Sequence, residues 1–268
     1  HVNMSQSSND VIPTAINISC YYDLTHFLFP ALKKLIKVIN DKSKKLHTIT
    51  KTGRTHLMDA MPITMEQELS AWRDTLINSE KVLVGLSKDL LKLPQGGTAV
   101  GTGINAHAKF SREFSHEVGL IIKAKVSPNK NFFQSLSAQD TSVRLSGELR
   151  NLATILMKIS NDLRWMNSGP LSGLGEIELE ALQPGSSIMP GKVNPVIPES
   201  VAMVCADAIG NDVTIAIAAQ SGNFQLNVML PVIAYNLLKS INILSGGMNI
   251  LADKAIKSFK VNKKNIDK

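Results

Sequence analysis

The segment from residue 213 to residue 238 constrains the fold more than any other part of the sequence, because it carries no charged residue over 26 positions. A run of this length and composition needs burial, either in a membrane or inside a protein. Polar and helix-interrupting residues nevertheless occur in it, namely Gln220, Ser221, Gly222, Asn223, Gln225, Asn227, Pro231 and Asn236. Because so many amides are costly in lipid, we expect a helix buried on all sides within a bundle and no membrane contact.

Helical periodicity extends over most of the chain. Apolar residues recur at three- and four-residue spacings in the ranges 30–50, 63–93 and 145–166, and further helices are expected over 198–221 and 229–253. Alternating strand patterns are scarce, and Gly/Pro-rich loops separate the helical stretches. We therefore predict an all-α protein in which long helices form an elongated bundle.

The composition is that of an ordinary globular protein, with 44% hydrophobic and 19% charged residues over 268 positions. The two cysteines, Cys20 and Cys205, stand in apolar stretches, which excludes a disulfide scaffold and a Cys-rich metal site within this chain. The net charge of +7 comes from lysines spread along the chain. We interpret them as solvated helix faces rather than a nucleic-acid-binding surface. Such a balance also suits acidic small-molecule substrates.

Neither an internal repeat nor a signal peptide is recognisable, and the chain begins with His1 rather than Met. We therefore expect a fragment of a longer protein. Its residues 1–253 are predicted to form one helical-bundle catalytic domain. The Lys/Asn-rich residues 254–268 are expected to begin a small C-terminal domain or to form a frayed end.

Four polar segments interrupt the helical pattern. Residues 5–10, Ser-Gln-Ser-Ser-Asn-Asp, precede an apolar run, which is typical of a capped helix N-terminus and also of a carboxylate site. Residues 52–59 hold His56 after a Gly-Arg-Thr turn. A lone histidine is more often structural than catalytic, although this one does not lie on an apolar face.

The third segment, residues 96–103, is rich in glycine but lacks the Gly-Lys-Ser/Thr ending of a phosphate loop, so we expect close backbone packing there. The fourth segment, residues 184–195, reads Pro-Gly-Ser-Ser-Ile-Met-Pro-Gly-Lys-Val-Asn-Pro. Its glycines and prolines exclude a regular helix. Its serines, lysine and asparagine suit a carboxylate-binding loop, while a mobile surface loop fits equally well.

The fourth segment resembles the signature Gly-Ser-Ser-x-x-Pro-x-Lys-x-Asn-Pro of the fumarase/aspartase superfamily. Residues 5–10 resemble the upstream Ser/Cys-Gln-Ser-Ser/Thr-Asn-Asp element of the same superfamily, and residues 53–56 resemble its Gly-Arg-Thr-His element. The three elements occur in the right order, and the resemblance covers essentially the whole chain. Within the superfamily the chain is most similar to class II fumarate hydratases, as Ser7-Ser8-Asn9 and Gly222-Asn223-Phe224 indicate. Residues 225–229, however, resemble the aspartase version.

The resemblance implies reversible hydration of fumarate to (S)-malate in the tricarboxylic acid cycle. Ser186 would act as the base at carbon, and His56, held by Glu199, would serve the hydroxyl side. The residues implied to bind the substrate carboxylates are Ser7, Ser8, Asn9, Thr55, Ser187, Lys192, Val193 and Asn194. No metal or organic cofactor is implied.

The resemblance also implies a homotetramer in which each active site is assembled from three chains, with neither nucleic acid nor membrane as a partner. The expected location is the cytoplasm, or the mitochondrion in a eukaryote. Relative to the family, the chain lacks the N-terminal domain and most of the small C-terminal domain. Two alternatives stay open: an aspartate ammonia-lyase on the same scaffold, and a non-catalytic assembly core.

Overall fold

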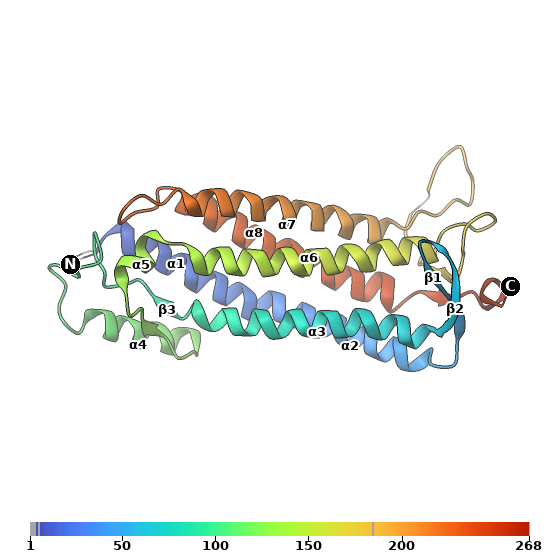
Figure 1. The fold of residues 1–268 in the computed structure, drawn as a ribbon, viewed down its shortest axis with the longest axis horizontal. Helices are drawn as coiled ribbons and strands as arrows, with labels where there is room; N and C mark the ends of the chain where they lie inside the picture. Colours follow the sequence, from blue (N-terminus) through green and yellow to red (C-terminus); the bar gives the residue numbers. More distant parts are fainter. Residues whose placement is uncertain (1–3, 5, 184, 268) are drawn as a thin grey trace. The chain divides into compact units, whose positions relative to one another are not determined.

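The computed structural model describes residue 4 and residues 6–183 and 185–267. Over these residues the fold is an all-α bundle of long helices, as the sequence predicts (Figure 1). The longest elements are α2 (Phe29–Lys45), α3 (Met65–Asp89), α6 (Asp140–Met166), α7 (Val196–Gln220) and α8 (Leu230–Leu251). Of the five predicted helices, the four that correspond to α3, α6, α7 and α8 agree closely with the observed bounds.

The chain divides into two compact units, and each is built from three separate stretches of sequence. The first unit takes residues 1–29, 81–150 and 208–242, and the second takes residues 30–80, 151–207 and 243–268. The helices α3, α6, α7 and α8 are each divided between the two units, with one end in the first unit and the other end in the second. The long helices are therefore shared elements, whereas the loops belong to one unit or the other.

The first unit begins with α1 (Ser8–Asp23), which continues through the π-helical turn η1 (Leu24–Leu28) into α2. It also contains α4, α5 and a short parallel pair of strands, with the bounds α4 (Phe110–Ile122), α5 (Phe132–Ser137), β3 (Lys92–Leu93) and β4 (Ser127–Pro128). The Gly-rich stretch follows β3. Gly96 has φ +108°, and a β-carbon built on it would lie 2.5 Å from the Ser111 β-carbon. The predicted close packing of this stretch is confirmed.

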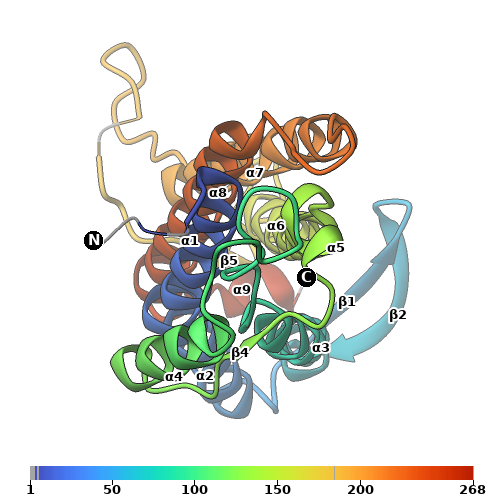
Figure 2. The ribbon, with the colours of Figure 1, turned by 90° about the vertical axis from the view of Figure 1, so that its left-hand side faces the viewer.

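The second unit carries an antiparallel hairpin that the sequence analysis did not predict, formed by β1 (Thr50–Thr55) and β2 (Met58–Thr64). The prediction of a helix over 30–50 was wrong at its end, because α2 stops at Lys45 and β1 follows. The hairpin projects from the helices of its own unit (Figures 1 and 2). It leads directly into α3, whose start is fixed by Thr64 and Gln67. Each of these residues donates its backbone N–H to the side-chain oxygen of the other, at 2.9 and 3.1 Å.

The rest of the second unit contains a short antiparallel pair, β5 (Ile177–Glu178) with β6 (Lys260–Val261), the π-helical turn η2 (Ala252–Ile256) and α9 (Lys263–Ile266). Residues 254–267 are therefore ordered into a turn, a strand and a helix. The predicted domain division at residue 253 stays a prediction.

Both cysteines lie in the interior, Cys20 on α1 and Cys205 on α7. Burial raises the pKa of each thiol to about 12, and the nearby charge of Asp23 adds to the effect at Cys20. Both thiols are therefore protonated near neutral pH and behave as small apolar core groups.

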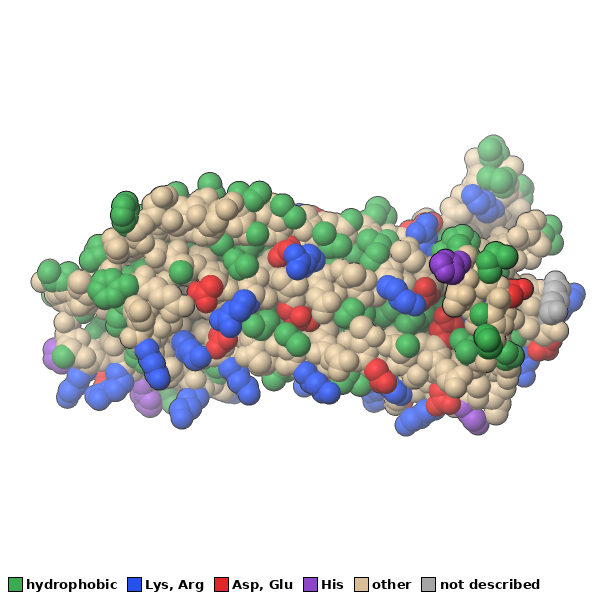
Figure 3. Space-filling model, viewed as in Figure 1, with side chains coloured by type: hydrophobic (Ala, Val, Ile, Leu, Met, Phe, Trp, Pro, Cys, Tyr) green, Lys and Arg blue, Asp and Glu red, His purple; other side chains and the backbone are tan. Residues whose placement is uncertain are grey.

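The charge-free segment 213–238 is not one helix, because α7 ends at Gln220 and α8 starts at Leu230. The expectation that it is buried on all sides is not met within a single chain: Val213 is 56% exposed, Ile217 53% and Tyr235 66%. Hydrophobic side chains are visible along α7, whereas Lys and Arg are spread over the visible face (Figure 3). One chain therefore covers only part of this segment.

By length and composition α7 is apolar enough to cross a membrane, a test that core helices of soluble proteins also pass. Asp212 on α7 is buried, and its two oxygens accept hydrogen bonds from Ser146 Oγ at 2.6 Å and Arg150 Nη1 at 2.7 Å. Such a carboxylate is stable only among polar protein partners. The contacts of α7 are therefore those of a bundle helix.

Candidate active site

Residues 7–10 form the N-terminus of α1, as the sequence predicts. Ser7 is the N-cap: its Oγ accepts a hydrogen bond from the Asn9 backbone at 3.1 Å, and Asp10 Oδ1 accepts one from the Ser7 backbone at 3.1 Å. Ser8 is exposed and Ser7 and Asn9 are half-buried. Ser5, which the motif also includes, lies outside the described residues. The positive end of α1 thus presents hydroxyl and amide groups that suit a carboxylate.

Asp10 fixes the N-terminus of α1 through contacts that the sequence analysis did not predict. It is fully buried, and its Oδ2 accepts hydrogen bonds from Gln95 Nε2 at 3.2 Å and from the backbones of Gly96 and Thr98 at 3.0 Å each. Asn9 Nδ2 donates to Ala99 O at 2.7 Å. These bonds attach the N-terminus of α1 to the Gly-rich stretch, so Asp10 holds Ser7, Ser8 and Asn9 in place. Its position at the end of the Ser-Ser-Asn-Asp element was the available signal.

Thr55 and His56 stand at the tip of the β1–β2 hairpin. Thr55 pairs with Met58, and the two turn residues between them, His56 and Leu57, have φ values of 55° and 59°. A two-residue turn with both φ angles positive is the type I′ turn, which glycine and asparagine usually occupy. Non-glycine residues in this region are strained, and such strain is found preferentially at functional sites. The turn leaves both Thr55 and His56 exposed.

The loop between β5 and α7 carries Ser186, Ser187, Lys192, Val193 and Asn194. Its base is closed by the Gly185 backbone, whose N–H donates to Lys192 O at 2.8 Å and whose carbonyl accepts from Asn194 Nδ2 at 3.4 Å. The Ile188 backbone donates to Ser186 Oγ at 3.2 Å. Ser186 and Asn194 are half-buried, whereas Ser187, Lys192 and Val193 are exposed. The loop thus presents an ammonium and a hydroxyl from one closed turn. Pro184 lies outside the described residues.

Glu199 lies in the first turn of α7 and is half-buried, with its backbone N–H donating to Pro195 O at 3.2 Å. Among the described residues, no hydrogen bond or ion pair joins any two of the side chains of Ser186, His56 and Glu199. One chain therefore carries these groups on separate elements without assembling them into a triad. The expected roles of all these residues stay predictions.

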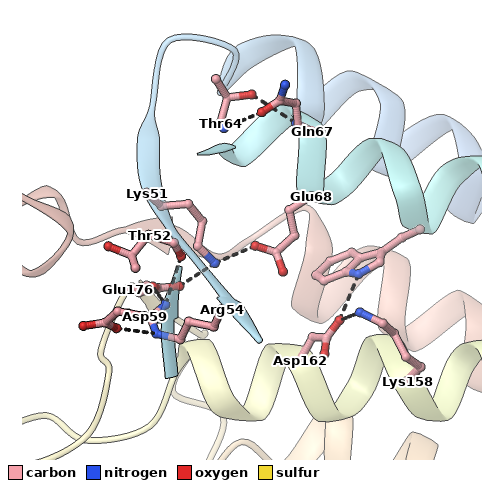
Figure 4. Close-up of polar contacts among 11 residues, drawn as sticks. Lys51, Thr52, Arg54, Asp59, Thr64, Gln67, Glu68, Lys158, Asp162 and Glu176 are labelled. Carbon is pink, nitrogen blue, oxygen red and sulfur yellow. Dashed lines mark hydrogen bonds and ion pairs between the residues drawn. The ribbon is translucent and has the colours of Figure 1, made fainter. Parts of the chain in front are cut away.

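A buried group of charges lies near the hairpin, and the sequence analysis missed it as well. Lys51 Nζ lies 2.5 Å from Glu68 Oε2 and 2.7 Å from Glu176 Oε2. Arg54 Nη1 donates to Glu176 Oε1 (Figure 4). Within the described part of the chain, no three or more His, Cys, Asp or Glu side chains are grouped to hold a metal ion.

A protein family described as "Lyase" matches residues 1–210 of the chain. The chain belongs to this lyase family. It is 58% identical to fumarate hydratase class II 2 of Pseudomonas aeruginosa, over 98% of this chain and 57% of that protein. It is 45% identical to fumarate hydratase class II of Bacillus subtilis, over 99% of this chain and 57% of that protein.

Solved structures agree with this assignment to the lyase family. The lyase chain superposes on a class II fumarase from Schistosoma mansoni with a TM-score of 0.98 and 37% identity, covering 100% of this chain and 59% of that one. It superposes on a fumarate lyase:delta crystallin from Brucella melitensis, bound to cobalt, with a TM-score of 0.96 and 43% identity. The match covers 99% of this chain and 58% of that one. The lyase chain thus spans somewhat more than half the length of the relatives it matches.

Replacing Asp10 with asparagine tests whether this carboxylate anchors the N-terminus of α1. The change keeps the side chain's shape but turns one acceptor into a donor facing the buried N–H groups. We expect the free energy of unfolding to fall by about 2–3 kcal/mol, measured by urea denaturation followed by circular dichroism. The same change at Asp23, at the other end of α1, serves as the control and is expected to alter stability by less than about 0.5 kcal/mol. Equal effects of the two variants would contradict the anchoring role.

Proposed function

We propose that the protein is a class II fumarate hydratase, a hydro-lyase that interconverts fumarate and (S)-malate. The observation that carries the proposal is the loop 185–195, in which the Ser186 hydroxyl, the Lys192 ammonium and the Asn194 amide stand on one closed turn. The relatives named fumarate hydratase class II support the choice of reaction.

Dehydration of malate needs a base for the proton beside a carboxylate, an acid for the departing hydroxyl, and donors that stabilise the doubly charged intermediate. In the proposal, Ser186 is the base at carbon. A serine hydroxyl acts as a base only where its oxyanion is stabilised. The Ile188 N–H, which already donates to Ser186 Oγ at 3.2 Å, and the positive charge of Lys192 would supply that stabilisation.

His56 serves the hydroxyl side in this proposal, with Glu199 fixing its tautomer and favouring the charged form. The exposed tip of the hairpin suits this role, because the imidazole is not committed to a structural contact among the described residues. The substrate carboxylates are assigned to the residues Ser7, Ser8, Asn9, Thr55, Ser187, Lys192, Val193 and Asn194. No metal or organic cofactor enters the proposed chemistry.

We further propose a homotetramer whose active sites are each shared among three chains. Two observations support it: His56 and Glu199 are not joined within one chain, and apolar residues such as Val213, Ile217 and Tyr235 are exposed on α7 and α8. A second copy of the chain is the occupant that would cover them. The proposed location is the cytoplasm, or the mitochondrion in a eukaryote, with no membrane or nucleic-acid partner.

A specific observation favours a second candidate, an aspartate ammonia-lyase. Residues 225–229 resemble the aspartase version of the segment between α7 and α8. In this segment Asn227 is buried, with its Nδ2 donating to Ala218 O at 3.0 Å, whereas Gln225 is exposed. An inactive assembly core is the third candidate.

The experiment that separates these functions follows fumarate at about 240 nm with malate and then with L-aspartate as substrate. A hydroxyl must be protonated to leave, whereas an ammonium already carries its proton and is repelled by a charged imidazole. We expect kcat/KM for malate to exceed that for aspartate at least about a hundredfold, or about 2.7 kcal/mol. Comparable turnover of aspartate would replace the fumarase proposal, and flat traces from a tetrameric sample would favour the assembly core.

Substitution of the two proposed acid–base residues tests their roles. Ser186→Ala is expected to remove most of kcat while binding of a substrate analogue is nearly unchanged, because the base acts in the transition state. His56→Asn is expected to lower kcat and alter its pH profile, and asparagine tolerates the left-handed turn that His56 occupies. Ser258→Ala, at a half-buried serine outside the site, is the control. If Ser186→Ala stays within about threefold of the parent, roughly 0.65 kcal/mol, the base is another residue.

Light scattering tests the assembly. We expect a tetramer in solution, since about half of the surface of Val213 and Ile217 on α7 is exposed in one chain. Ile217→Lys should shift the population toward smaller species, because burying an unpaired ammonium is costly. Val84→Lys, at a partly exposed valine of α3, is the matched control. A monodisperse parent monomer would contradict the proposed assembly.

A further inference from the structure

A cluster of four charged side chains lies at the base of the β1–β2 hairpin: Lys51 and Glu176, which are buried, and Arg54 and Glu68, which are partly exposed (Figure 4). The side chains of Lys51 and Glu176 are only 5% and 4% exposed. Isolated charges at such positions are strongly disfavoured, and the cluster contains two cations and two anions. Its members are therefore stable only when they remain together in this arrangement.

Three elements of the second unit meet in the cluster. Lys51 and Arg54 belong to β1, Glu68 to the first turn of α3, and Glu176 stands just before β5. The backbone of Glu176 is itself fixed, since its carbonyl accepts a hydrogen bond from the Asn262 N–H at 2.9 Å. Glu176 thus links a fixed segment, which leads toward the loop 185–195, to β1, which ends at Thr55 and is followed by His56.

Glu176 contacts both cations by using one carboxylate oxygen for each, Oε2 for Lys51 and Oε1 for Arg54. Lys51 and Arg54 are three residues apart, and in a regular strand side chains with that spacing point to opposite faces. The pairing shifts beside them: Thr52 pairs with Pro62 and Arg54 with Asp59, so the extra residue of a bulge lies in β2. Gly53 faces this bulge closely, because a β-carbon there would lie 2.7 Å from Met61 O. The Arg54 guanidinium also donates to Thr52 O at 3.2 Å within β1.

We propose that Glu176 is a positioning residue of the active site, whose carboxylate holds Arg54 and Lys51 and thereby fixes the hairpin tip that carries Thr55 and His56. This inference rests on the proposed fumarase function for its kinetic test. Without the carboxylate, the buried Lys51 keeps only Glu68 as an ionic partner within the described part of the chain. Arg54 keeps only the exposed Asp59 there, at 3.7 Å, so the base of the hairpin loses its central contact. His56 lies two residues beyond Arg54 and loses its fixed position.

The kinetic test uses Glu176→Gln in the intact protein, with Glu180→Gln as the matched control. Glu180 lies four residues further along the same segment, and its partly exposed carboxylate is 3.8 Å from Lys254 Nζ. We expect Glu176→Gln to lower kcat/KM for malate at least about tenfold and Glu180→Gln to leave it within about twofold. In a His56→Asn background, Glu176→Gln should cost less than about threefold, because its effect passes through the hairpin tip.

Hydrogen exchange supplies a readout that does not depend on activity. Glu176→Gln should accelerate exchange of the backbone amides of residues 50–64 while those of α6 keep the parent rate, and Glu180→Gln should change neither. If Glu176→Gln fails to fold, Lys51→Met/Glu176→Gln restores the charge balance. Because Arg54 still lacks its contact with Glu176 in that variant, both the kinetic and the exchange defects should persist.

The outcomes separate the two proposals. A parent protein that dehydrates no malate overturns the fumarase proposal, and the exchange experiment then decides the positioning role alone. With an active parent, the positioning role is overturned if Glu176→Gln retains kcat/KM within about threefold. It is also overturned if the loss is as large in the His56→Asn background, or if exchange of residues 50–64 is unchanged.

Discussion

Burial of one apolar stripe along α6 is the constraint on which the rest of the fold depends. The stripe residues recur every three or four positions and are all buried: Leu145, Leu149, Leu152, Leu156, Ile159 and Leu163. Full burial of such a side chain stabilises a fold by about 1.5–3 kcal/mol. Because α6 contributes residues to both units, the same stripe supplies core side chains to each of them.

The candidate site residues lie at, or just before, the N-termini of three helices. Ser7 to Asn9 cap α1, the hairpin with His56 precedes α3, and the loop with Ser186 precedes α7. In the first unit Asp10 anchors its element through three hydrogen bonds to one oxygen, and in the second unit Glu176 anchors the hairpin through two cations. A buried carboxylate that loses its partners is costly, so each anchor specifies one arrangement of an otherwise exposed segment.

The exposed apolar residues of α7 lie on a side of the helix that faces away from the core of the chain. α7 uses one side for contacts within the chain, including the buried Asp212, and leaves Val213 and Ile217 on another. Scattered exposed hydrophobic residues are normal, whereas a row of them on one helix is the kind of surface that the proposed assembly would cover. In the proposed tetramer, His56 and Glu199, which are not joined within one chain, would be brought together by contacts between chains.

The amino-acid sequence by itself determined the helices α3, α6, α7 and α8, the break near Gly222, the capped start of α1 and the tight packing at Gly96. These features depend on neighbours a few residues away, so periodicity and local chemistry reveal them. The tertiary structure decided the β1–β2 hairpin, where a bulge and Pro62 hide the strand pattern, and it decided the exposure of α7. It also decided the roles of Asp10 and Glu176, because their partners Gln95 and Arg54 lie 85 and 122 residues away along the chain. No local pattern carries that information, since these polar contacts form only when folding brings residues distant in the sequence together.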